Sequence, residues 1–214
     1  ESAKNGKQRG LGSNSYIEAC GIAPSNLVGV LGSRVGLYDA ATVRVNATGN
    51  ISVWVGAHSH GQGQETAFPQ VVAEMLGVDP MSVEIVHGDT SKIPFGMGTY
   101  GSRSLAVCGS AVFRATEKII KKATLIAAHM MEDAPDNVDF ADGEFSVKGT
   151  NKKVSFGEVA LKAYIPHDFP IEDIEPGLEE TAFYDPQNFT YPSGAYACEV
   201  EVDAETGKVD IWSV

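Results

Sequence analysis

The chain has 214 residues, of which 43% are hydrophobic and 21% are charged, enough apolar side chains for one large or two small globular domains. Its formal net charge of -12, from 16 Lys and Arg against 28 Asp and Glu, argues against a phosphate-binding surface, so we expect no nucleic acid partner. There is neither a run of about 18 apolar residues nor a charged leader before an apolar stretch. We therefore predict no membrane span and no signal peptide, and expect a cytoplasmic protein.

The two ends of the chain indicate a fragment of a longer protein. The first residue is not Met, and the apolar run 209–214 stops without a turn. We divide the chain into a polar tail, 1–10, and a fragment of one larger domain, 11–214. The cysteines are far apart with no C-x-x-C spacing, which disfavours iron–sulfur, zinc and disulfide frameworks and predicts small buried side chains. They are Cys20, Cys108 and Cys198.

Hydrophobic periodicity predicts strands and one helix in the first half of the chain. Alternating apolar residues indicate strands over 11–22 and 42–55, the second folded into a hairpin around a turn at 48–50. After a break rich in glycine and histidine, apolar residues recur at helical spacing and predict an amphipathic helix over 66–77. A short strand is predicted at 83–86.

The second half begins with a polar, glycine-rich loop, 87–104, of the kind that usually carries function. Small residues at i+4 steps then predict the longest helix, 105–131, packed closely on a sheet. Further segments are predicted in this order: a hairpin over 140–147, a capping-box helix over 155–164, an irregular connector over 165–192, and a hairpin joining 196–202 to 209–214. Strands interleaved with two long helices, but also joined by hairpins, predict an α+β fold with a mixed sheet.

Two loops built alike carry the candidate cofactor-binding residues. Each is rich in glycine and hydrogen-bonding side chains and enters a helix N-terminus, where free N–H groups and partial positive charge favour anions. Two such termini suit a large anionic ligand. The alternative is that the glycines serve only tight turns and that Thr66 and Ser104 are plain N-caps. The candidates are Gly61, Gln62 and Gly63 in the first loop and Tyr100, Gly101, Ser102, Arg103 and Ser104 in the second.

Other residues are candidates for a metal site, a phosphate-binding side chain or a dinucleotide motif. His58 and His60 are expected on one face of a strand, with His87 as a third candidate, but no carboxylate or cysteine is paired with them locally, so a hydrogen-bonding or structural role is favoured over metal binding. The forked guanidinium of Arg103 is interpreted as a phosphate clamp rather than a solvated side chain. The G-x-G-x-x-G run over 96–101 matches the dinucleotide fingerprint only formally, because the preceding strand ends about ten residues earlier. No hydrolase motif is present.

Five runs, read in chain order, carry a family resemblance. They are Gly61-Gln62-Gly63-Gln64-Glu65-Thr66, Ala73-Glu74-Met75-Leu76-Gly77-Val78, Gly88-Asp89-Thr90, Gly98-Thr99-Tyr100-Gly101-Ser102-Arg103-Ser104 and Pro192-Ser193-Gly194-Ala195-Tyr196. Together they resemble the molybdopterin-binding region of large subunits in the xanthine oxidase, or molybdenum hydroxylase, family. Within that family, the wording of both loops is most similar to the aerobic carbon monoxide dehydrogenases.

The resemblance implies a molybdenum–molybdopterin cofactor, in its cytosine dinucleotide form, that hydroxylates substrate with oxygen from water. It implies that Gln62 approaches the molybdenum centre, that the Gly101 backbone lies close to it, and that Ser102, Arg103 and Ser104 hold the pterin or its phosphates. It also implies a parent enzyme that is either of the carbon monoxide dehydrogenase type, with copper, or of the aldehyde or xanthine dehydrogenase type. The expected partners are the remainder of the large subunit, a medium subunit carrying FAD and a small subunit carrying 2Fe-2S clusters.

Two family elements have no counterpart in the chain: the loop with the copper-binding cysteine, and the Gly-x-Gly-Glu motif whose glutamate is the base near molybdenum. We therefore assign no catalytic residue and expect the isolated fragment to be inactive. Two other hypotheses stay open. One is a non-catalytic α+β module that has kept the fold and binds a protein partner through its acidic surface, and the other is an independent nucleotide-binding protein that uses 96–104.

Overall fold

The computed structural model describes residues 2–22 and 24–214. These form two compact units: Glu1–Cys20 with Thr190–Val214, and the continuous segment Gly21–Phe189. Among the described residues, no helix combines the length and the apolar character needed to span a bilayer.

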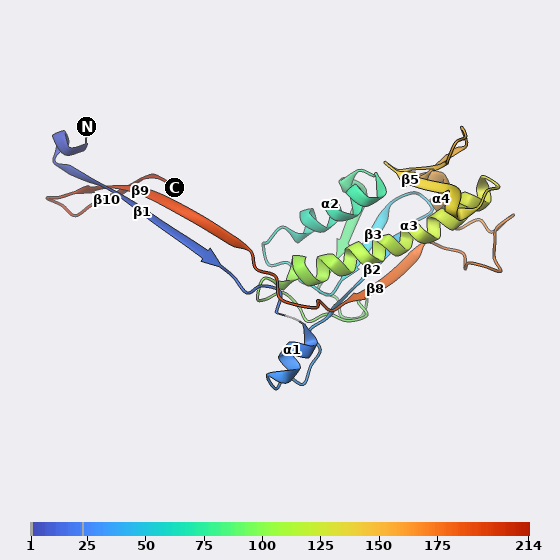
Figure 1. Cartoon of the computed structure of the whole chain (residues 1–214), viewed down its shortest axis with the longest axis horizontal. Helices are drawn as coiled ribbons and strands as arrows, with labels where there is room; N and C mark the ends of the chain where they lie inside the picture. The colour runs from blue at the N-terminus through green and yellow to red at the C-terminus, as the bar shows by residue number, and fades with distance from the viewer. Residues whose placement is uncertain (1, 23) are drawn as a thin grey trace. The chain divides into compact units, whose positions relative to one another are not determined.

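The first unit is a narrow antiparallel sheet (Figure 1) with the strand order β1-β9-β10. Its elements are a 3-10 turn at Ser2–Asn5, β1 (Lys7–Ile17), β9 (Ser193–Asp203) and β10 (Val209–Ser213). The C-terminal hairpin predicted from the sequence is confirmed. The first strand, however, begins at Lys7, inside the segment expected as a polar tail, whose residue 1 lies outside the described residues. It is continuously paired with β9, from Lys7 opposite Asp203 to Ile17 opposite Ser193, so β1 ends well before 22.

The second unit is built on a four-stranded mixed sheet with the order β4-β3-β2-β8. Its strands are β2 (Asp39–Val45), β3 (Ile51–Val55), β4 (Val83–Val86) and β8 (Glu179–Tyr184). The β2–β3 and β2–β8 pairs are antiparallel and the β3–β4 pair is parallel. The predicted hairpin around 48–50 and the mixed sheet are therefore confirmed.

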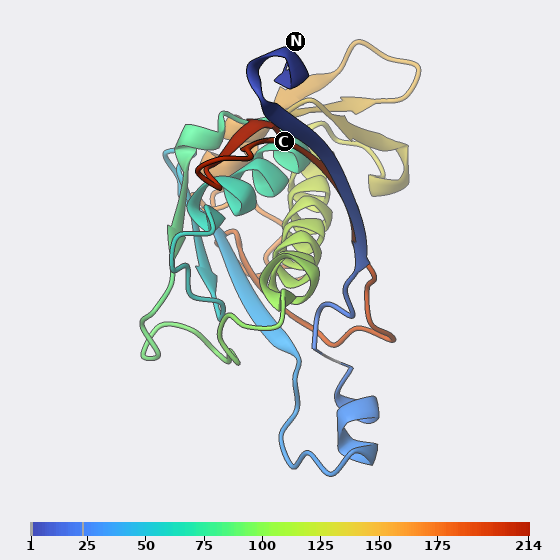
Figure 2. The same cartoon turned by 90° about the vertical axis from the view of Figure 1, so that its left-hand side faces the viewer.

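Two helices, α2 (Gln64–Leu76) and α3 (Ser110–Met130), lie side by side on one face of this sheet (Figure 2). Alternate residues of β2 and β3 point toward them, so Val43 and Val53 are fully buried against the helices. Gly77 ends α2 in the left-handed conformation, as its position predicts. The longest helix differs from the prediction at its start, because a π-helical turn, Ser104–Gly109, precedes α3.

The rest of the second unit consists of short elements. They are α1 (Ser25–Val30), a small antiparallel sheet of β5 (Val138–Ala141), β6 (Glu144–Val147) and β7 (Lys153–Ser155), α4 (Phe156–Lys162), and 3-10 turns at Pro80–Ser82 and Pro135–Asn137. The capping box predicted at Ser155 and Glu158 is present, with both of its hydrogen bonds formed. Strand β7 was not predicted, because three residues are too short for a periodic signal.

The prediction of an irregular connector over 165–192 is wrong in one part. Strand β8 lies within it and forms the edge of the main sheet beside β2. The prolines and acids on both sides of β8 hide it in the sequence, and its pairing is decided by tertiary contacts. Ala182 is buried in the core, and the Thr181 hydroxyl is hydrogen-bonded to that of Thr42 at 2.7 Å.

Candidate functional site

The two glycine-rich loops border one pocket with a volume of about 440 Å³. The predicted residues in its lining are Gln62, Tyr100, Gly101, Ser102 and Ser104, and the lining also includes His60, Gln64, Thr99 and Phe68. The fold thus brings together segments about forty residues apart in the sequence, because α2 and the helix that follows the second loop pack side by side. Gly61 and Gly63 flank this lining, and Arg103 lies behind it.

The first loop is shaped by glycines in the left-handed region. Gly61 has φ 103° and Gly63 has φ 74°, and a Cβ at either position would have no atom within 4 Å, so backbone conformation rather than packing favours glycine. The side-chain oxygen of Gln62 accepts the backbone N–H of His60 at 2.7 Å. This leaves the side-chain NH₂ of Gln62 as the group free to donate to a ligand.

The N-cap alternative is wrong for both helix starts. The N-cap of α2 is Gly63, not Thr66, and no side chain caps that terminus. At the second helix start the N-cap is Arg103, again without a side-chain cap, and the Ser104 hydroxyl donates instead to Thr99 Oγ1 at 2.9 Å. Two helix N-termini without side-chain caps therefore border one pocket, an arrangement that favours a bound anion.

The second loop is pressed against the segment that precedes α1. The Gly101 carbonyl accepts the Gly21 N–H at 3.1 Å, and a Cβ on Gly101 would lie 2.3 Å from Ile22 Cδ1. Gly101 has φ 57° and Ser102 has φ 53°, an unusual conformation for serine. Such backbone strain persists where surrounding contacts impose it, and here it turns the loop toward the pocket.

Arg103 is not brought into the pocket. Its side chain is completely buried and forms an ion pair with the equally buried Asp39, with Nη1 2.7 Å from Asp39 Oδ2. The guanidinium also donates to the carbonyls of Gly98, Leu37 and Tyr38, at 2.7, 2.8 and 3.2 Å. The expected phosphate clamp thus has no geometric basis, because the fork of donors is used to hold the loop. Asp39 lies in no recognisable motif, so the sequence alone could not have identified it as the partner of Arg103.

Two backbones meet directly beside this ion pair. A Cβ built on Gly56 would lie 2.1 Å from Asp39 Oδ1 and 2.5 Å from the Gly96 Cα. The buried thiol of Cys108 is close enough that Asp39 affects it, and burial raises its pKa to about 12, as expected for a small apolar side chain rather than a reactive one. Only glycine fits at this crossing, which fixes the end of β3 against the second loop.

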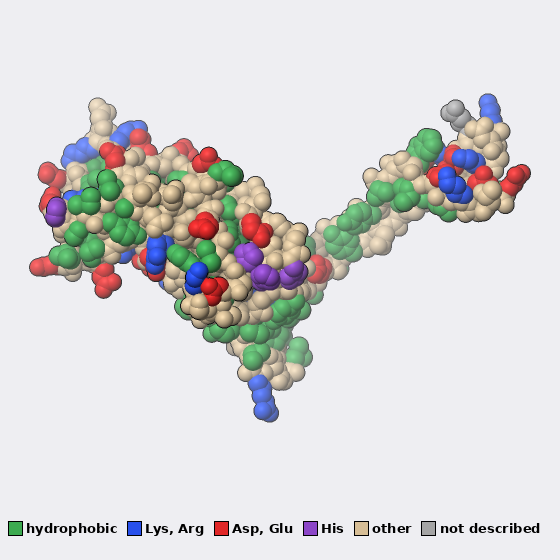
Figure 3. Space-filling model, turned by 180° about the vertical axis from the view of Figure 1, so that it is seen from behind, with side chains coloured by type: hydrophobic (Ala, Val, Ile, Leu, Met, Phe, Trp, Pro, Cys, Tyr) green, Lys and Arg blue, Asp and Glu red, His purple; other side chains and the backbone are tan. Residues whose placement is uncertain are grey.

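His58, His60 and His87 lie close together, beyond the end of β3 rather than on one face of a strand. Figure 3 shows a group of histidine side chains on one face of the surface, apart from another single histidine. His58 Nδ1 lies 2.9 Å from His87 Nδ1, and His87 Nε2 lies 3.1 Å from Glu65 Oε1, whereas the His58 and His60 ring centres are 6.2 Å apart. The carboxylate that the sequence analysis did not pair with the histidines is thus supplied by the first turn of α2. Hydrogen bonds from its own backbone N–H and from Ser59 lower the pKa of Glu65. Within 2–22 and 24–214, no three His, Cys, Asp or Glu side chains are arranged to hold a metal ion.

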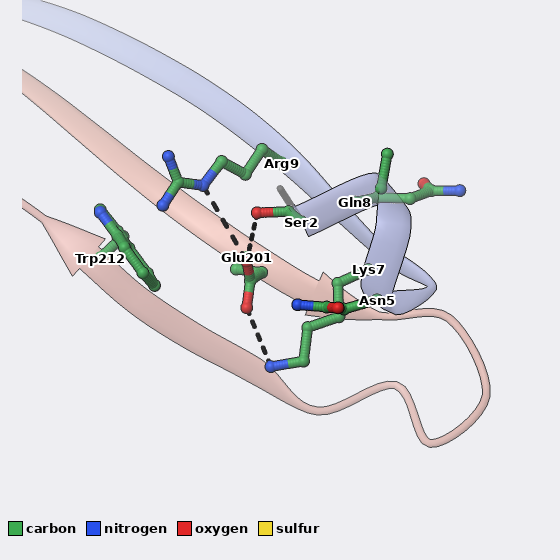
Figure 4. A pocket seen from close by; sticks show the side chains of 8 residues that line it. Ser2, Asn5, Lys7, Gln8, Arg9, Glu201 and Trp212 are labelled. Carbon is green, nitrogen blue, oxygen red and sulfur yellow. Dashed lines mark hydrogen bonds and ion pairs between the residues drawn. The ribbon is translucent and has the colours of Figure 1, made fainter.

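A larger hollow of about 830 Å³ lies in the first unit (Figure 4), but its charges are already paired. The buried carboxylate of Glu201 accepts the Ser2 hydroxyl and the Lys7 ammonium, the latter at 2.9 Å, and Arg9 Nε lies 4.0 Å away. Arg9 also stacks on Trp212, 4.0 Å from the ring centre. We interpret this cluster as a structural tie between β1 and β9.

Glu201 predicts an acid-sensitive strand pair. The Ser2 and Lys7 hydrogen bonds lower the pKa of Glu201, so its contribution to stability is complete above the ordinary Glu range and is lost as pH falls through the folded-state value. We expect amide protection in β1 and β9 to fall on acidification in the full-length protein, and Glu201→Gln to remove that dependence. Hydrogen exchange measures it, with Glu205→Gln in the exposed turn as the control. An unchanged pH profile in Glu201→Gln would contradict this assignment.

Comparison with known proteins bears on this pocket. The family model described as the molybdopterin cofactor-binding domain matches residues 1–214. The carbon monoxide dehydrogenase large chain of Hydrogenophaga pseudoflava is 40% identical over 203 residues, covering 94% of this chain and 25% of the relative. The nicotine 6-hydroxylase large subunit of Paenarthrobacter nicotinovorans is 34% identical over 215 residues, covering 100% of this chain and 26% of the relative.

The fold agrees with solved structures of the same group. A crystal structure of Cu,Mo-CO dehydrogenase in its carbon monoxide-reduced state superposes with a TM-score of 0.87 at 37% identity, covering 98% of this chain and 26% of that one. The chain therefore spans about a quarter of the length of these relatives. The family resemblance predicted from the two loops is confirmed, and the chain belongs to the molybdopterin cofactor-binding domain family.

Proposed function

We propose that the pocket between the two loops holds part of a molybdenum–molybdopterin cofactor, and that this chain is the cofactor-binding part of a molybdenum hydroxylase large subunit. The observation that carries the proposal is the pair of uncapped helix N-termini bordering one pocket that also presents Gln, Thr and Ser side chains. A pterin bearing phosphate needs such a set of donors at an anion-favouring site. When bound, the cofactor supplies the hydroxylation of substrate with oxygen from water.

Each predicted site residue is given a role that its geometry allows. The free side-chain NH₂ of Gln62 donates to the cofactor near its metal. The Gly101 backbone and the Ser102 and Ser104 side chains border the same pocket and bind the pterin or its phosphates. Arg103 acts indirectly, by holding this loop in place from behind.

The remaining cofactor-site residues set the shape of the loops. Gly61 and Gly63 allow the left-handed backbone of the first loop. The Tyr100 ring, 5.5 Å from the Arg103 guanidinium carbon and partly exposed, closes one side of the pocket. These roles require no catalytic side chain from the described residues, which fits a cradle to which another part of the large subunit supplies the base.

The finer features of the cofactor, substrate and partners are also part of the proposal. Because the curated relatives include carbon monoxide dehydrogenase large chains, we propose carbon monoxide as the first substrate to test, with copper in the parent enzyme. We propose the cytosine dinucleotide form of the cofactor, a cytoplasmic location, and partner subunits carrying FAD and 2Fe-2S clusters. Residues 11–214 are proposed as part of one cofactor-binding domain of the larger chain.

The direct test is analysis of the full-length protein purified with its neighbouring subunits. Molybdenum together with acid-released CMP would support the cradle, and copper in addition would favour carbon monoxide as substrate. Properly matured protein that contains neither molybdenum nor CMP would overturn the proposal.

Replacing Gln62 with leucine is expected to reduce cofactor retention about tenfold, because one hydrogen bond to a charged or strongly polar ligand is lost, and because the His60 N–H that helps to shape the loop loses its acceptor. The molybdenum and CMP contents after extensive dialysis measure the effect. The matched control is Gln70→Leu, at an exposed residue of α2, the helix that follows the first loop, outside the pocket lining. Equal retention in the two variants would show that Gln62 does not contact the cofactor.

A further inference from the structure

A hydrogen-bonded chain of three side chains ties the first loop to the two elements beside it. His58 lies in that loop, His87 follows β4, and Glu65 is in the first turn of α2. The two contacts, His58 Nδ1 to His87 Nδ1 and His87 Nε2 to Glu65 Oε1, measure 2.9 and 3.1 Å. The backbone N–H of His58 also donates to Thr99 Oγ1 at 3.0 Å, so these hydrogen bonds reach the second loop as well.

The contact between two Nδ1 atoms needs one donor and one acceptor. With both rings neutral, His58 donates from Nδ1, His87 accepts, and the Nε2–H of His87 donates to the Glu65 carboxylate. One added proton preserves the contact, since one of the two Nδ1 atoms still has a lone pair. A second added proton puts hydrogens on both Nδ1 atoms and a positive charge on both rings, and the contact is then lost.

Three elements place charged or titratable groups around the pair. Glu65 from α2 is the carboxylate bonded to the pair. From the first loop, the ring of His60 is 6.2 Å from that of His58 and adds a further titratable group. Beyond His87, the Asp89 carboxylate is bonded to Ser91 and paired with Lys92.

We propose that His58, His87 and Glu65 form a pH-sensitive latch that holds the first loop against β4 and α2 and thereby positions Gln62 at the pocket. Protonation of both histidines releases the loop and opens the pocket. All three are positioning residues. The opening of the loop depends only on residues of this protein. Its effect on cofactor release rests on the proposed function.

The test follows amide hydrogen exchange of peptides covering 58–67 in the full-length protein between pH 5.5 and 7.5, corrected for intrinsic exchange rates. We expect wild-type protection to fall about tenfold across this range, while peptides from the middle of α3 stay unchanged. His87→Ala should show the tenfold lower protection already at pH 7.5, with no further fall in acid. Glu65→Gln removes the charge that stabilises protonated His87 and should move the opening to lower pH.

His167→Ala is the matched control, because His167 is an exposed histidine of the same unit that takes no part in the latch. It should behave like the wild type. Equal protection of 58–67 in wild type and His87→Ala at pH 7.5, or a wild-type pH profile in both His87→Ala and Glu65→Gln, would overturn the latch.

A second readout separates the latch from the proposed function. Molybdenum and CMP released from the same samples should rise as the loop opens. If the loop opens as expected in properly matured protein that contains no molybdenum or CMP, the latch stands and the cofactor proposal fails. If cofactor is bound but exchange of 58–67 does not respond to pH or to His87→Ala, the cofactor proposal stands and the latch fails.

Discussion

Replacing Arg103 with methionine is expected to lower the local unfolding free energy around β2 and the second loop by about 3–5 kcal/mol, the range found when one partner of a buried ion pair is removed. Both side chains of the pair are completely buried, so the Asp39 carboxylate would keep its desolvation cost without its counter-charge. The carbonyls of Leu37 and Tyr38 would also lose their donors. Because the same guanidinium holds the second loop, we expect cofactor retention to fall as well.

The pH dependence of this effect has a definite sign. Burial raises the pKa of Asp39, and the Arg103 charge offsets this only in part, so in the variant the folded-state value rises further. A carboxyl group whose pKa is raised in the folded state contributes most to stability below its unfolded-state pKa. That contribution is lost as the pH rises through the folded-state pKa. The destabilisation of Arg103→Met should therefore be larger at pH 8 than at pH 5.

Hydrogen exchange of β2 amides in the full-length protein measures both the size and the pH dependence of the effect. Arg34→Met, at an exposed arginine of the same unit, is the control. The double variant Asp39→Leu with Arg103→Met removes both charges and should recover part of the loss. A loss below about 1 kcal/mol in Arg103→Met would place this pair among ordinary surface ion pairs and contradict the argument.

The second large effect is expected where the backbones of Gly56 and Gly96 meet. Gly56→Ala should cost about 3 kcal/mol, the upper part of the range for overpacking, because its Cβ would meet Asp39 Oδ1 at 2.1 Å and backbone atoms of the second loop at 2.5 Å. Backbone cannot rotate away as a flexible side chain does, so the end of β3 and the second loop must separate. The pocket between the loops would widen, and cofactor retention should fall together with stability.

Gly157→Ala provides the comparison for this variant. Gly157 lies in α4, where an added Cβ would have no atom within 4 Å, so alanine there should stabilise the helix by about 0.5–1 kcal/mol. Hydrogen exchange of β3 and of α4 amides reads out the two sites in the same protein. If Gly56→Ala is as well tolerated as Gly157→Ala, the close backbone approach is not a constraint in solution.

The local patterns of the chain determined its secondary structure and the place of its candidate site. Alternating valines and isoleucines predicted the β2–β3 hairpin, helical spacing with a terminal glycine predicted α2, and the two glycine loops marked the pocket. These features depend on residues near one another in sequence, where the periods of strands and helices and the conformational freedom of glycine act directly. The family resemblance came from the same short runs.

Only the tertiary structure decided what depends on partners distant in sequence. It placed β8 beside β2, paired the full length of β1 with β9, and linked His87 to Glu65 rather than grouping His58 with His60. It also turned Arg103 inward to Asp39, 64 residues away, although a loop arginine among glycines and serines predicts a ligand contact. The residue type and its charge determine what a side chain can bind, but packing decides which partner lies close enough. A buried ionic group without a partner is energetically costly, so burial requires such a partner.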